Sequence, residues 1–326
     1  MEKKIRVAVT EVSHWHSPEY LNGIQKTKQA ELVAVSDRNG ELARQKARPY
    51  GSRWYTDYQT MLEKEKPDFV FILGVHREMP AIIQAVTERA IPFCVEKPAA
   101  VSSAELIPCL EQVQKKDLYH SVPFVYRLSP VSRHLLEWHR AGLLGQWIAL
   151  KFCFVTGPPE RYRQWQCEWN LSKKLAGGGT TINLSVHYLD LFRYLTGEEI
   201  VHVKAVLSRK RFQEEVEDYS LVFLETNRGT IGEVETGYLS PPEERADRDT
   251  FVIYTEKRKI TFRENVLGWK DYSGEAGEEK ISSENPRLRF VEETLTGFSR
   301  GKPAIADLND MLAVLRIIDR VYQNNH

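Results

Sequence analysis

Glu96 and Lys97 stand in the position that most clearly suits chemistry, because an acid and a base lie side by side where a predicted strand ends. Residues 69–73, 80–90 and 92–95 have the pattern strand, helix, strand. A short apolar strand after a helical crossover is typical of a parallel sheet buried on both faces, and ligands bind at the carboxyl ends of such strands. A functional site is therefore predicted at this pair. The alternative is a solvated charge pair where the strand leaves the core.

Three polar side chains share one face of a second predicted segment. A glycine triplet at 177–179 precedes a helix predicted over residues 180–196, in which Asn183, His187 and Asp190 are spaced i, i+4 and i+7. Such a polar stripe is unusual on a helix whose other residues are apolar, so these side chains are candidates for a site. The alternative is a histidine that is hydrogen-bonded within the core.

The first 40 residues have the β-α-β layout of a dinucleotide site. Residues 5–9 and 32–36 are predicted strands, residues 19–29 are a predicted helix, and Asp37 stands at the tip of the second strand. In a dinucleotide site the pyrophosphate rests on the first helix N-terminus and the carboxylate binds ribose hydroxyls. A plain β-α-β unit without a ligand is the alternative.

The turn of this unit lacks the glycines of the G-x-G-x-x-G fingerprint, which let the backbone approach the phosphates closely. Glu11 and His16 stand near the first and last glycine positions, with Ser13 between them. If a dinucleotide binds, we expect Ser13, His14 and Trp15 to supply side-chain donors and a ring in place of bare backbone. The phosphates would then lie farther from the helix.

Strands and helices continue to alternate up to residue 125. Helices are predicted at 41–50, at 57–65 with Thr56 as N-cap, and from Ser102 to residue 116, and a further strand is predicted at 120–125. This alternation predicts one doubly wound parallel sheet.

From residue 126 onward the strands become longer and alternate between apolar and polar residues, which predicts an antiparallel sheet with one covered face. These strands are predicted at 147–155, 201–208, 218–225, 229–235, 251–256 and 259–263. Segments 240–249 and 268–280 are predicted surface loops, and 287–300 and 307–322 are predicted closing helices. The predicted fold class is α/β: a Rossmann domain over residues 1–124, a largely antiparallel α+β domain over 125–304, and a helix at 305–323 that packs back on the first domain.

Composition excludes several classes of protein. A chain of 326 residues with 42% hydrophobic and 28% charged residues is typical of a soluble globular protein of two domains. Lys+Arg and Asp+Glu are equal at 45 each, which gives no electrostatic case for nucleic acid or for a membrane surface. No apolar run approaches the ~20 residues of a membrane span. No signal peptide is recognised, and the four cysteines lack C-x-x-C spacing, so free thiols in a reducing cytoplasm are expected.

The Glu96-Lys97-Pro98 motif and the later segment GGGTTINLSVHYLD together resemble the Gfo/Idh/MocA family of NAD(P)-dependent oxidoreductases. The resemblance extends over nearly the whole chain and includes residues 126–130 and 142–145. It implies that Lys97 lies beside the nicotinamide and hydrogen-bonds the substrate hydroxyl, and that His187 acts as general acid/base, for which an ordinary pKa of ~6.5 is suitable. Asn183 stands where relatives often have aspartate, and we expect it to orient substrate because an amide does not take up a proton.

The resemblance also implies a cofactor site, with NAD favoured because Asp37 accepts the ribose hydroxyls and repels a 2′-phosphate. In this interpretation Arg38 either stacks on adenine or weakens the repulsion of a 2′-phosphate, so NADP stays an alternative cofactor. The loop after the fourth strand departs from the T-P-x-x-x-H of relatives, with methionine at the usual histidine. The expected cofactor contacts are Ser13, His14, Trp15, Asp37, Arg38, Gly74, Val75, His76, Met79, Glu96, Lys97 and Arg127. No metal site is expected, since His14, His16 and His76 lie on two separate loops without carboxylate or thiol partners.

A sugar, inositol or sugar-like polyol is the expected substrate, held by Lys97, Asn183, His187 and Trp165. The neighbouring side chains Arg161, Tyr162, Arg163 and Trp169 are expected to line the same side, where rings and forked donors suit a polyhydroxylated ring. A structured loop without ligand is the alternative for that run. The competing function is a catalytically silent regulatory or ligand-binding protein of the same fold. We further expect a homo-oligomer, a dimer or tetramer, that forms through the C-terminal sheet.

Overall fold

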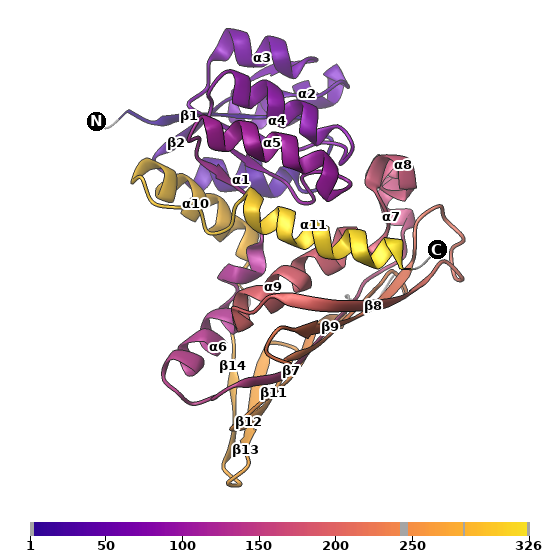
Figure 1. Ribbon diagram of the computed structural model, residues 1–326. Coiled ribbons are helices and arrows are strands. Elements are labelled where there is room, and N and C mark those ends of the chain that lie inside the picture. Colours follow the sequence, from indigo (N-terminus) through magenta and orange to yellow (C-terminus); the bar gives the residue numbers. More distant parts are fainter. Residues whose placement is uncertain (1–2, 242–246, 283, 325–326) are drawn as a thin grey trace.

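Two β-sheets, one from each half of the chain, organise the computed structural model, which describes residues 3–241, 247–282 and 284–324 (Figure 1). The first has strand order β3-β2-β1-β4-β5-β6, and all its pairs are parallel. Its strands are β1 (Ile5–Val9), β2 (Ala30–Ser36), β3 (Arg53–Tyr55), β4 (Phe69–Ile72), β5 (Phe93–Val95) and β6 (His120–Ser121). The predicted doubly wound parallel sheet is confirmed. The chain order reverses between β1 and β4, which is where such sheets bind ligands.

Burial explains why β4 forms the centre of this sheet: all four of its side chains are 0% exposed. Helices pack on both faces of the sheet, as its continuous apolar strands require. They are α1 (Ser17–Lys26), α2 (Gly40–Ala47), α3 (Tyr58–Glu65), α4 (Met79–Glu88) and α5 (Ser103–Lys115). Asp57, rather than the predicted Thr56, is the N-cap of α3, because its side chain accepts a hydrogen bond from the Thr60 amide.

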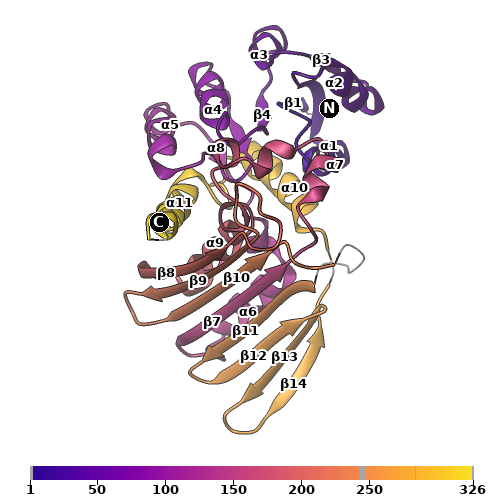
Figure 2. The ribbon, with the colours of Figure 1, turned by 90° about the vertical axis from the view of Figure 1, so that its right-hand side faces the viewer.

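The second sheet has strand order β14-β13-β12-β11-β7-β10-β9-β8 and is antiparallel except for the pair β7 and β10 (Figure 2). Its strands are β7 (Trp147–Val155), β8 (Ile200–Ser208), β9 (Tyr219–Thr226), β10 (Ile231–Gly237), β11 (Asp247–Thr255), β12 (Arg258–Arg263), β13 (Val266–Asp271) and β14 (Ala276–Lys280). The inward side chains of β9 and β10, among them Val222, Leu224 and Val234, join one core with α9 (Val186–Thr196). The predicted mainly antiparallel sheet with one covered face is confirmed.

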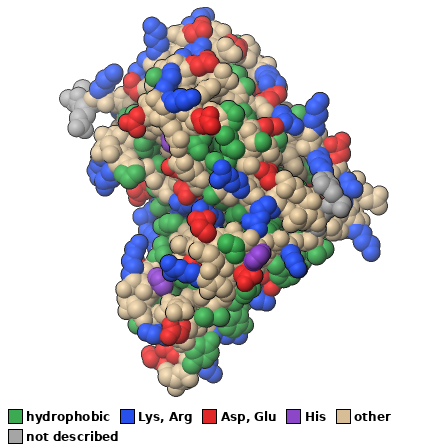
Figure 3. All heavy atoms as spheres, viewed as in Figure 1, with side chains coloured by type: hydrophobic (Ala, Val, Ile, Leu, Met, Phe, Trp, Pro, Cys, Tyr) green, Lys and Arg blue, Asp and Glu red, His purple; other side chains and the backbone are tan. Residues whose placement is uncertain are grey.

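Helices from the end of the chain join the two sheets. Helix α10 (Pro286–Ser299) packs against α1, and α11 (Leu308–Gln323) packs against both α5 and α9. On α11, Asp319 accepts from the Ser103 amide, while Arg320 donates to the Val201 carbonyl at 2.6 Å. Helix α6 (Pro130–Arg140) also belongs to the second half, and its N-cap Ser129 accepts a hydrogen bond from the Ser132 amide. Acidic and basic side chains are interspersed over the face seen in Figure 3.

Three predictions about the course of the backbone were wrong in whole or in part. Residues 268–280 belong to the hairpin β13–β14 instead of a loop, because tertiary contacts stabilise it: Trp269 packs at 5.1 Å on Trp138 of α6, and Glu279 lies 3.1 Å from His134. The strand predicted at 120–125 ends at Ser121, and a short helical turn follows. Of the predicted loop 240–249, residues 242–246 lie outside the described residues, and residues 247–249 belong to β11 instead of a loop. No helix within the described residues is long and apolar enough to cross a membrane.

The crossing of α1 and α10 yields a packing prediction. A β-carbon added to Gly23 would lie 2.9 Å from Cβ of Val291. Gly23→Ala gains roughly 0.5–1 kcal/mol in helix propensity, but overpacking costs roughly 1–3 kcal/mol. We therefore expect the free energy of unfolding, measured in urea, to fall by about 1 kcal/mol. In a Val291→Ala background the same change should cost less, because the Cγ atoms at 3.0 and 3.2 Å are removed while Cβ at 2.9 Å remains. A stabilising effect of Gly23→Ala in the wild-type background would contradict this account of the packing.

Candidate active site

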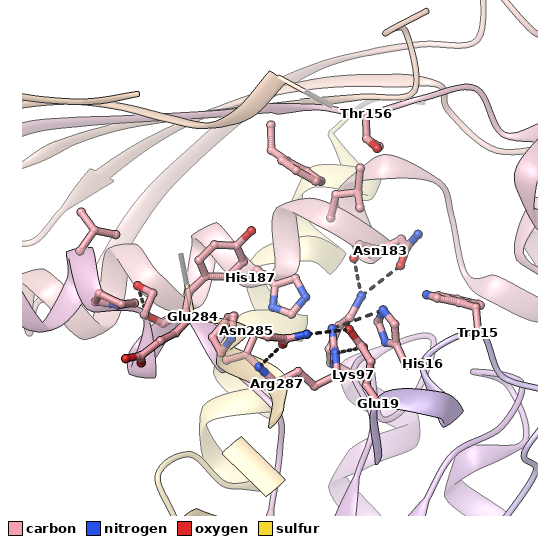
Figure 4. Close-up of a pocket in the computed structure, with 18 of the residues that line it drawn as sticks. Trp15, His16, Glu19, Lys97, Thr156, Asn183, His187, Glu284, Asn285 and Arg287 are labelled. Carbon is pink, nitrogen blue, oxygen red and sulfur yellow. Dashed lines mark hydrogen bonds and ion pairs between the residues drawn. The ribbon is translucent and has the colours of Figure 1, made fainter. Parts of the chain in front are cut away.

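A cavity of ≈ 840 Å³ lies where the carboxyl edge of the first sheet faces the second half of the chain (Figure 4). From the first half it is lined by Trp15, His16, Glu19 and Lys97. The side chains from the second half that matter below are Tyr126, Arg161, Tyr162, Trp165, Asn183, His187, Glu284 and Arg287. The structure therefore brings together Lys97, Asn183 and His187, which sequence reasoning placed in one site from segments far apart in the chain.

The ammonium group of Lys97 is buried, 2% exposed, at the end of β5. It donates to the backbone carbonyl of Asn183 at 2.6 Å and to the side-chain Oδ1 of Asn183 at 3.0 Å. A π-helical turn at Thr181–Ser185 places Asn183 there, and such turns occur frequently at functional sites. The amide nitrogen of Asn183 donates to the hydroxyls of Tyr162 at 2.7 Å and Tyr238 at 3.0 Å. Asn183 thus holds Lys97 in position, and because it also lines the cavity, its expected role in orienting substrate stays a prediction.

His187 follows Asn183 by one helical turn and borders the same cavity. Its ring lies 5.4 Å from that of Tyr126, and its buried Nδ1 has no hydrogen-bonding partner within the described residues. Burial lowers the pKa of His187 well below its ordinary value, and the positive charge of Lys97 lowers it further. The imidazole is therefore neutral at neutral pH. Burial also lowers the pKa of Lys97, to about 8, although the charge of Glu96 opposes this shift.

Glu96 lies beneath this site at 0% exposure and keeps its negative charge. Burial by itself raises the pKa of Glu96, but the guanidinium of Arg287 at 3.2 Å and the nearby rings of His16 and His14 together outweigh burial, so the pKa lies well below its ordinary value. Tyr20 donates to the same carboxylate at 2.6 Å. His16 lies 3.3 Å away and stays neutral, because burial lowers its pKa to about 4. Arg287 also pairs with Glu19 at 2.6 Å, and these ion pairs attach α10 to the edge of the first sheet.

Hydrogen bonds within the first loop already satisfy several of its amides. Glu11 occupies the first glycine position with a left-handed backbone, at φ 47°. The Ser13 amide donates to Oδ2 of Asp37 at 2.6 Å, and Oδ1 of Asp37 accepts from the Asn39 amide at 2.9 Å. The Ser17 amide, at the start of α1, donates to a carbonyl of the same loop at 2.9 Å. In the usual dinucleotide turn, amides at these positions point at phosphate oxygens.

Aromatic rings cover this loop. His14 stacks on Trp15 with ring centroids 4.0 Å apart, and Trp169 lies 5.4 Å from Trp15 and 4.8 Å from His76. His76 in turn shares a 2.9 Å hydrogen bond with the carbonyl of Ala176. Burial lowers the pKa of His76 to about 3 and that of His14 well below its ordinary value, so both rings are neutral. The segment 160–176 therefore closes over the two loops that sequence reasoning assigned to cofactor.

The residue types at this edge still fit a dinucleotide. Asp37 stands at the end of β2, and Gly74, at φ 155°, leaves room at the end of β4, where an added β-carbon would be 3.3 Å from Ile82 Cδ1. Binding requires Ser13 and Asp37 to exchange their mutual hydrogen bond for bonds to the cofactor. Arg38 forms a two-bond pair with Glu78, at 3.0 and 2.6 Å, which reduces the charge that it offers to a 2′-phosphate.

Of the twelve expected cofactor contacts, Trp15 and Lys97 line the cavity and the other ten do not. Met79 is fully buried in the apolar core at the start of α4. Arg127 donates to Asp190 from Nη2 at 2.6 Å and from Nε at 2.9 Å, and it also pairs with Asp310 at 2.8 Å. Asp190, a site candidate by its place in the polar stripe with Asn183 and His187, is therefore the partner of Arg127. Val75 and Glu96 likewise do not line the cavity.

On the substrate side, Arg161, Tyr162 and Trp165 line the cavity as expected. Arg163 instead pairs with Glu214 at 2.8 Å, and Trp169 belongs to the ring cluster. Sequence reasoning missed Tyr20, Glu19, Tyr238 and Arg287, because each sits in an ordinary helix or strand pattern and only the fold brings it to the site. Within the described residues no group of three or more His, Cys, Asp or Glu side chains has the arrangement of a metal site.

Comparison with known proteins agrees with this geometry. Residues 5–124 match the model of an oxidoreductase family with an NAD-binding Rossmann fold, and residues 132–261 match the GFO/IDH/MocA C-terminal domain. The scyllo-inositol 2-dehydrogenase (NAD(+)) of Bacillus subtilis is 30% identical over 254 residues, which are 74% of this chain and 69% of that protein. The rhizopine catabolism protein MocA of Rhizobium meliloti is 26% identical over 217 residues, 65% of each chain. A solved levoglucosan dehydrogenase in complex with NADH and levoglucosan has the same fold, with a TM-score of 0.87 at 18% identity over 99% of this chain and 97% of that one.

The ion pairs of Glu96 predict a strong dependence of stability on Arg287. Arg287→Met leaves a buried carboxylate without its cation, and breaking a buried pair in this way costs about 3–5 kcal/mol in the free energy of unfolding. Guanidinium unfolding of the variant should show this loss. Adding Glu96→Gln to Arg287→Met should recover much of it. Glu19→Gln, which breaks the more exposed pair, should cost about 0–1 kcal/mol. Equal losses for Arg287→Met and Glu19→Gln would contradict the importance of Glu96.

Proposed function

The chain belongs to the GFO/IDH/MocA family of oxidoreductases, and from this premise we propose that it transfers a hydride between NAD and a hydroxyl-bearing carbon of a sugar, inositol or related polyol. One observation carries the proposal: the buried ammonium of Lys97, with a pKa of about 8, borders a cavity that both halves of the chain line. The scyllo-inositol relative supports a polyol substrate. In this proposal residues 1–124 supply the cofactor side and residues 125–304 the substrate side.

NAD, when bound, accepts the hydride at its nicotinamide ring. The residues that would hold it are Asp37, on the ribose hydroxyls, and the first loop with Ser13 and Trp15. A second acidic side chain near Asp37 favours NAD over NADP. Glu11 is close enough to Asp37 for the two carboxyl groups to interact. Burial raises the pKa of Glu11 to about 7, and the charge of Asp37 contributes to this shift. We also place the protein in the cytoplasm, which its four free cysteines support.

The proton of the substrate hydroxyl passes to Lys97 in this proposal. A general base works best when its pKa lies near the working pH, and about 8 for Lys97 meets this condition. The low pKa of His187 makes it a weaker acceptor, and its neutral ring is suited to hydrogen-bond the substrate and to keep the hydroxyl oriented. Asn183 holds the amine through two hydrogen bonds and so acts as a positioning residue.

Oxidation of a polyol by this mechanism should depend on the protonation of Lys97. We expect kcat/KM to rise with pH and to level off above about 8, as Lys97 loses its proton. Lys97→Met should lower kcat by about 100-fold or more and remove this pH limb, because removing a general base typically costs about 10²–10⁴-fold. The measurement is NADH formation with scyllo-inositol or another polyol across pH 6–10. A Lys97→Met variant that retains the wild-type pH profile would contradict the role.

A catalytically silent ligand-binding protein is the second candidate, and the bond between Ser13 and Asp37 favours it because the cofactor must displace that bond. Titration of NADH, followed by its fluorescence, separates the two functions. Saturable binding together with turnover that Lys97→Met abolishes supports the enzyme. Binding without turnover of any polyol tested supports a sensor, and absence of binding to both NADH and NADPH would remove the dehydrogenase proposal.

Self-association through the second sheet is also proposed. The face of this sheet opposite α9 carries Val206, Phe223 and Ile231, which are 61%, 42% and 48% exposed. They stand on the neighbouring strands β8, β9 and β10 at diagonal positions, with Lys204 and Glu233 directly opposite Phe223. Exposed patches of this kind on antiparallel sheets are typical of interfaces between copies.

We expect Phe223→Lys to shift the protein from an oligomer to a monomer, because a charge at the centre of an apolar interface is left without a partner. Light scattering coupled to size-exclusion chromatography at micromolar concentration measures the change. Trp54→Lys, on the edge strand β3 of the other sheet and 45% exposed, is the matched control and should leave the mass unchanged. A wild-type protein with the mass of a monomer would refute the interface.

A further inference from the structure

We propose that the substrate is a sugar acid, and that Arg161 receives its carboxylate at the end of the cavity away from the reacting hydroxyl. The inference rests on the proposed function, since Lys97 marks the reacting end of the same cavity. Arg161 belongs to α7 (Glu160–Gln164), in the segment that closes over the first sheet. Its side chain lines the cavity and is only partly exposed.

The charges that line the cavity show that Arg161 is available to a ligand. Both carboxylates of the lining are already paired: Glu19 with Arg287 at 2.6 Å, and Glu284 with Arg289 at 3.4 Å. Arg287 also forms an ion pair with Glu96, so the positive charge of Arg287 is neutralised within the protein. Lys97 and Arg161 are the two lining Lys or Arg residues that make no ion pair within the described part of the chain. Lys97 is assigned to the substrate hydroxyl, which leaves Arg161 for an anion.

Neutral groups fix the guanidinium of Arg161 in place. Its Nη1 donates to the carbonyl oxygens of Gly157 and Pro158, and its Nη2 donates to the hydroxyl of Tyr162 at 3.3 Å. The guanidinium lies over the rings of Tyr162, at 4.9 Å, and Tyr238, at 5.0 Å. None of these partners carries a negative charge, so the full positive charge of Arg161 remains for a ligand.

Two N–H groups of Arg161 have no acceptor within residues 3–241, 247–282 and 284–324: the one on Nε and the second one on Nη2. A guanidinium has five N–H donors in a fixed plane, and a carboxylate binds two of them at once. One guanidinium balances the single charge of a carboxylate, whereas a phosphate carries about −1.5 to −2 at neutral pH. The site therefore favours a carboxylate over a phosphate.

A chain of hydrogen bonds connects Arg161 with the reacting end. The hydroxyl of Tyr162 accepts from Arg161 at 3.3 Å and from Asn183 at 2.7 Å, and Asn183 in turn accepts from Lys97 at 3.0 Å. The two cations thus stand along one wall, with the side chains of Tyr162 and Asn183 between them. A sugar ring that presents one hydroxyl to Lys97 can present a remote carboxylate to Arg161. Trp165, 47% exposed beside Arg161, offers an aromatic face to the ring.

The test compares each hexose with the uronate that differs from it only in a carboxylate at C6: D-glucose with D-glucuronate, D-galactose with D-galacturonate, and D-mannose with D-mannuronate. Calorimetric Kd values in the presence of NAD, and kcat/KM for NADH formation, are measured for wild-type protein. We expect at least one uronate to bind more tightly than its hexose, by roughly 10- to 100-fold, which is typical of hydrogen bonds to a charged group. Sodium acetate at the same concentration controls for general anion binding.

Arg161→Gln should reduce this preference to near unity, because it weakens uronate binding more than hexose binding. Arg161→Lys should recover part of the preference, since it keeps the charge but not the planar fork. The matched control is Arg163→Gln, whose guanidinium pairs with Glu214 outside the cavity and which should behave as wild type. Thermal unfolding of each variant verifies that it is folded.

Three results would overturn the inference: no saturable binding of any of the three uronates, equal affinity within every pair, or an equal loss for acid and neutral sugar in Arg161→Gln. These results are distinguishable from failure of the proposed function. An enzyme that reduces NAD with a neutral polyol in a Lys97-dependent way, but shows no preference for acids, keeps the dehydrogenase proposal and loses only the carboxylate. A protein that binds uronates through Arg161 without turnover keeps the carboxylate site and loses the dehydrogenase.

Discussion

The buried carboxylate of Glu96 is the charge around which the site is arranged. An ionised carboxylate at 0% exposure is stable only with a cation and hydrogen-bond donors around it, and Arg287 and Tyr20 supply them. Because Arg287 comes from α10, neutralising Glu96 also holds the closing helices against the carboxyl edge of the first sheet. That position completes one side of the cavity, so the charge balance of one residue in β5 and the shape of the cavity depend on each other.

Lys97 shows how burial, rather than the identity of the residue, produces a group suited to proton transfer. In water a lysine is protonated well above neutral pH, but burial lowers the pKa here to about 8, and the charge of Glu96 limits the shift. The neutral acceptors of Asn183 orient the amine without adding a charge that would reverse this effect. His187 experiences the opposite balance, because the neighbouring positive charge and burial both lower its pKa.

The first loop shows a different solution from the usual glycine turn. Without those glycines, the loop folds on itself through the bond from Ser13 to Asp37, and Trp15 and Trp169 cover it. The loop expected to contact the cofactor and the segment expected to border the substrate are thus in mutual contact, through the rings of Trp15 and Trp169.

The sequence by itself determined the sheet class, the parallel first half, the antiparallel second half, and the meeting of Lys97, Asn183 and His187. Periodicity and strand ends report the two sheets, because both depend on local burial, whereas the meeting of Lys97, Asn183 and His187 was implied by the resemblance to the Gfo/Idh/MocA family. The partners were decided only by the tertiary structure: Asn183 holding Lys97, Arg287 holding Glu96, and Asp190 holding Arg127. The members of these pairs are 86, 191 and 63 residues apart. Local patterns carry no signal for them, because a buried charge selects its partner by proximity in the folded chain.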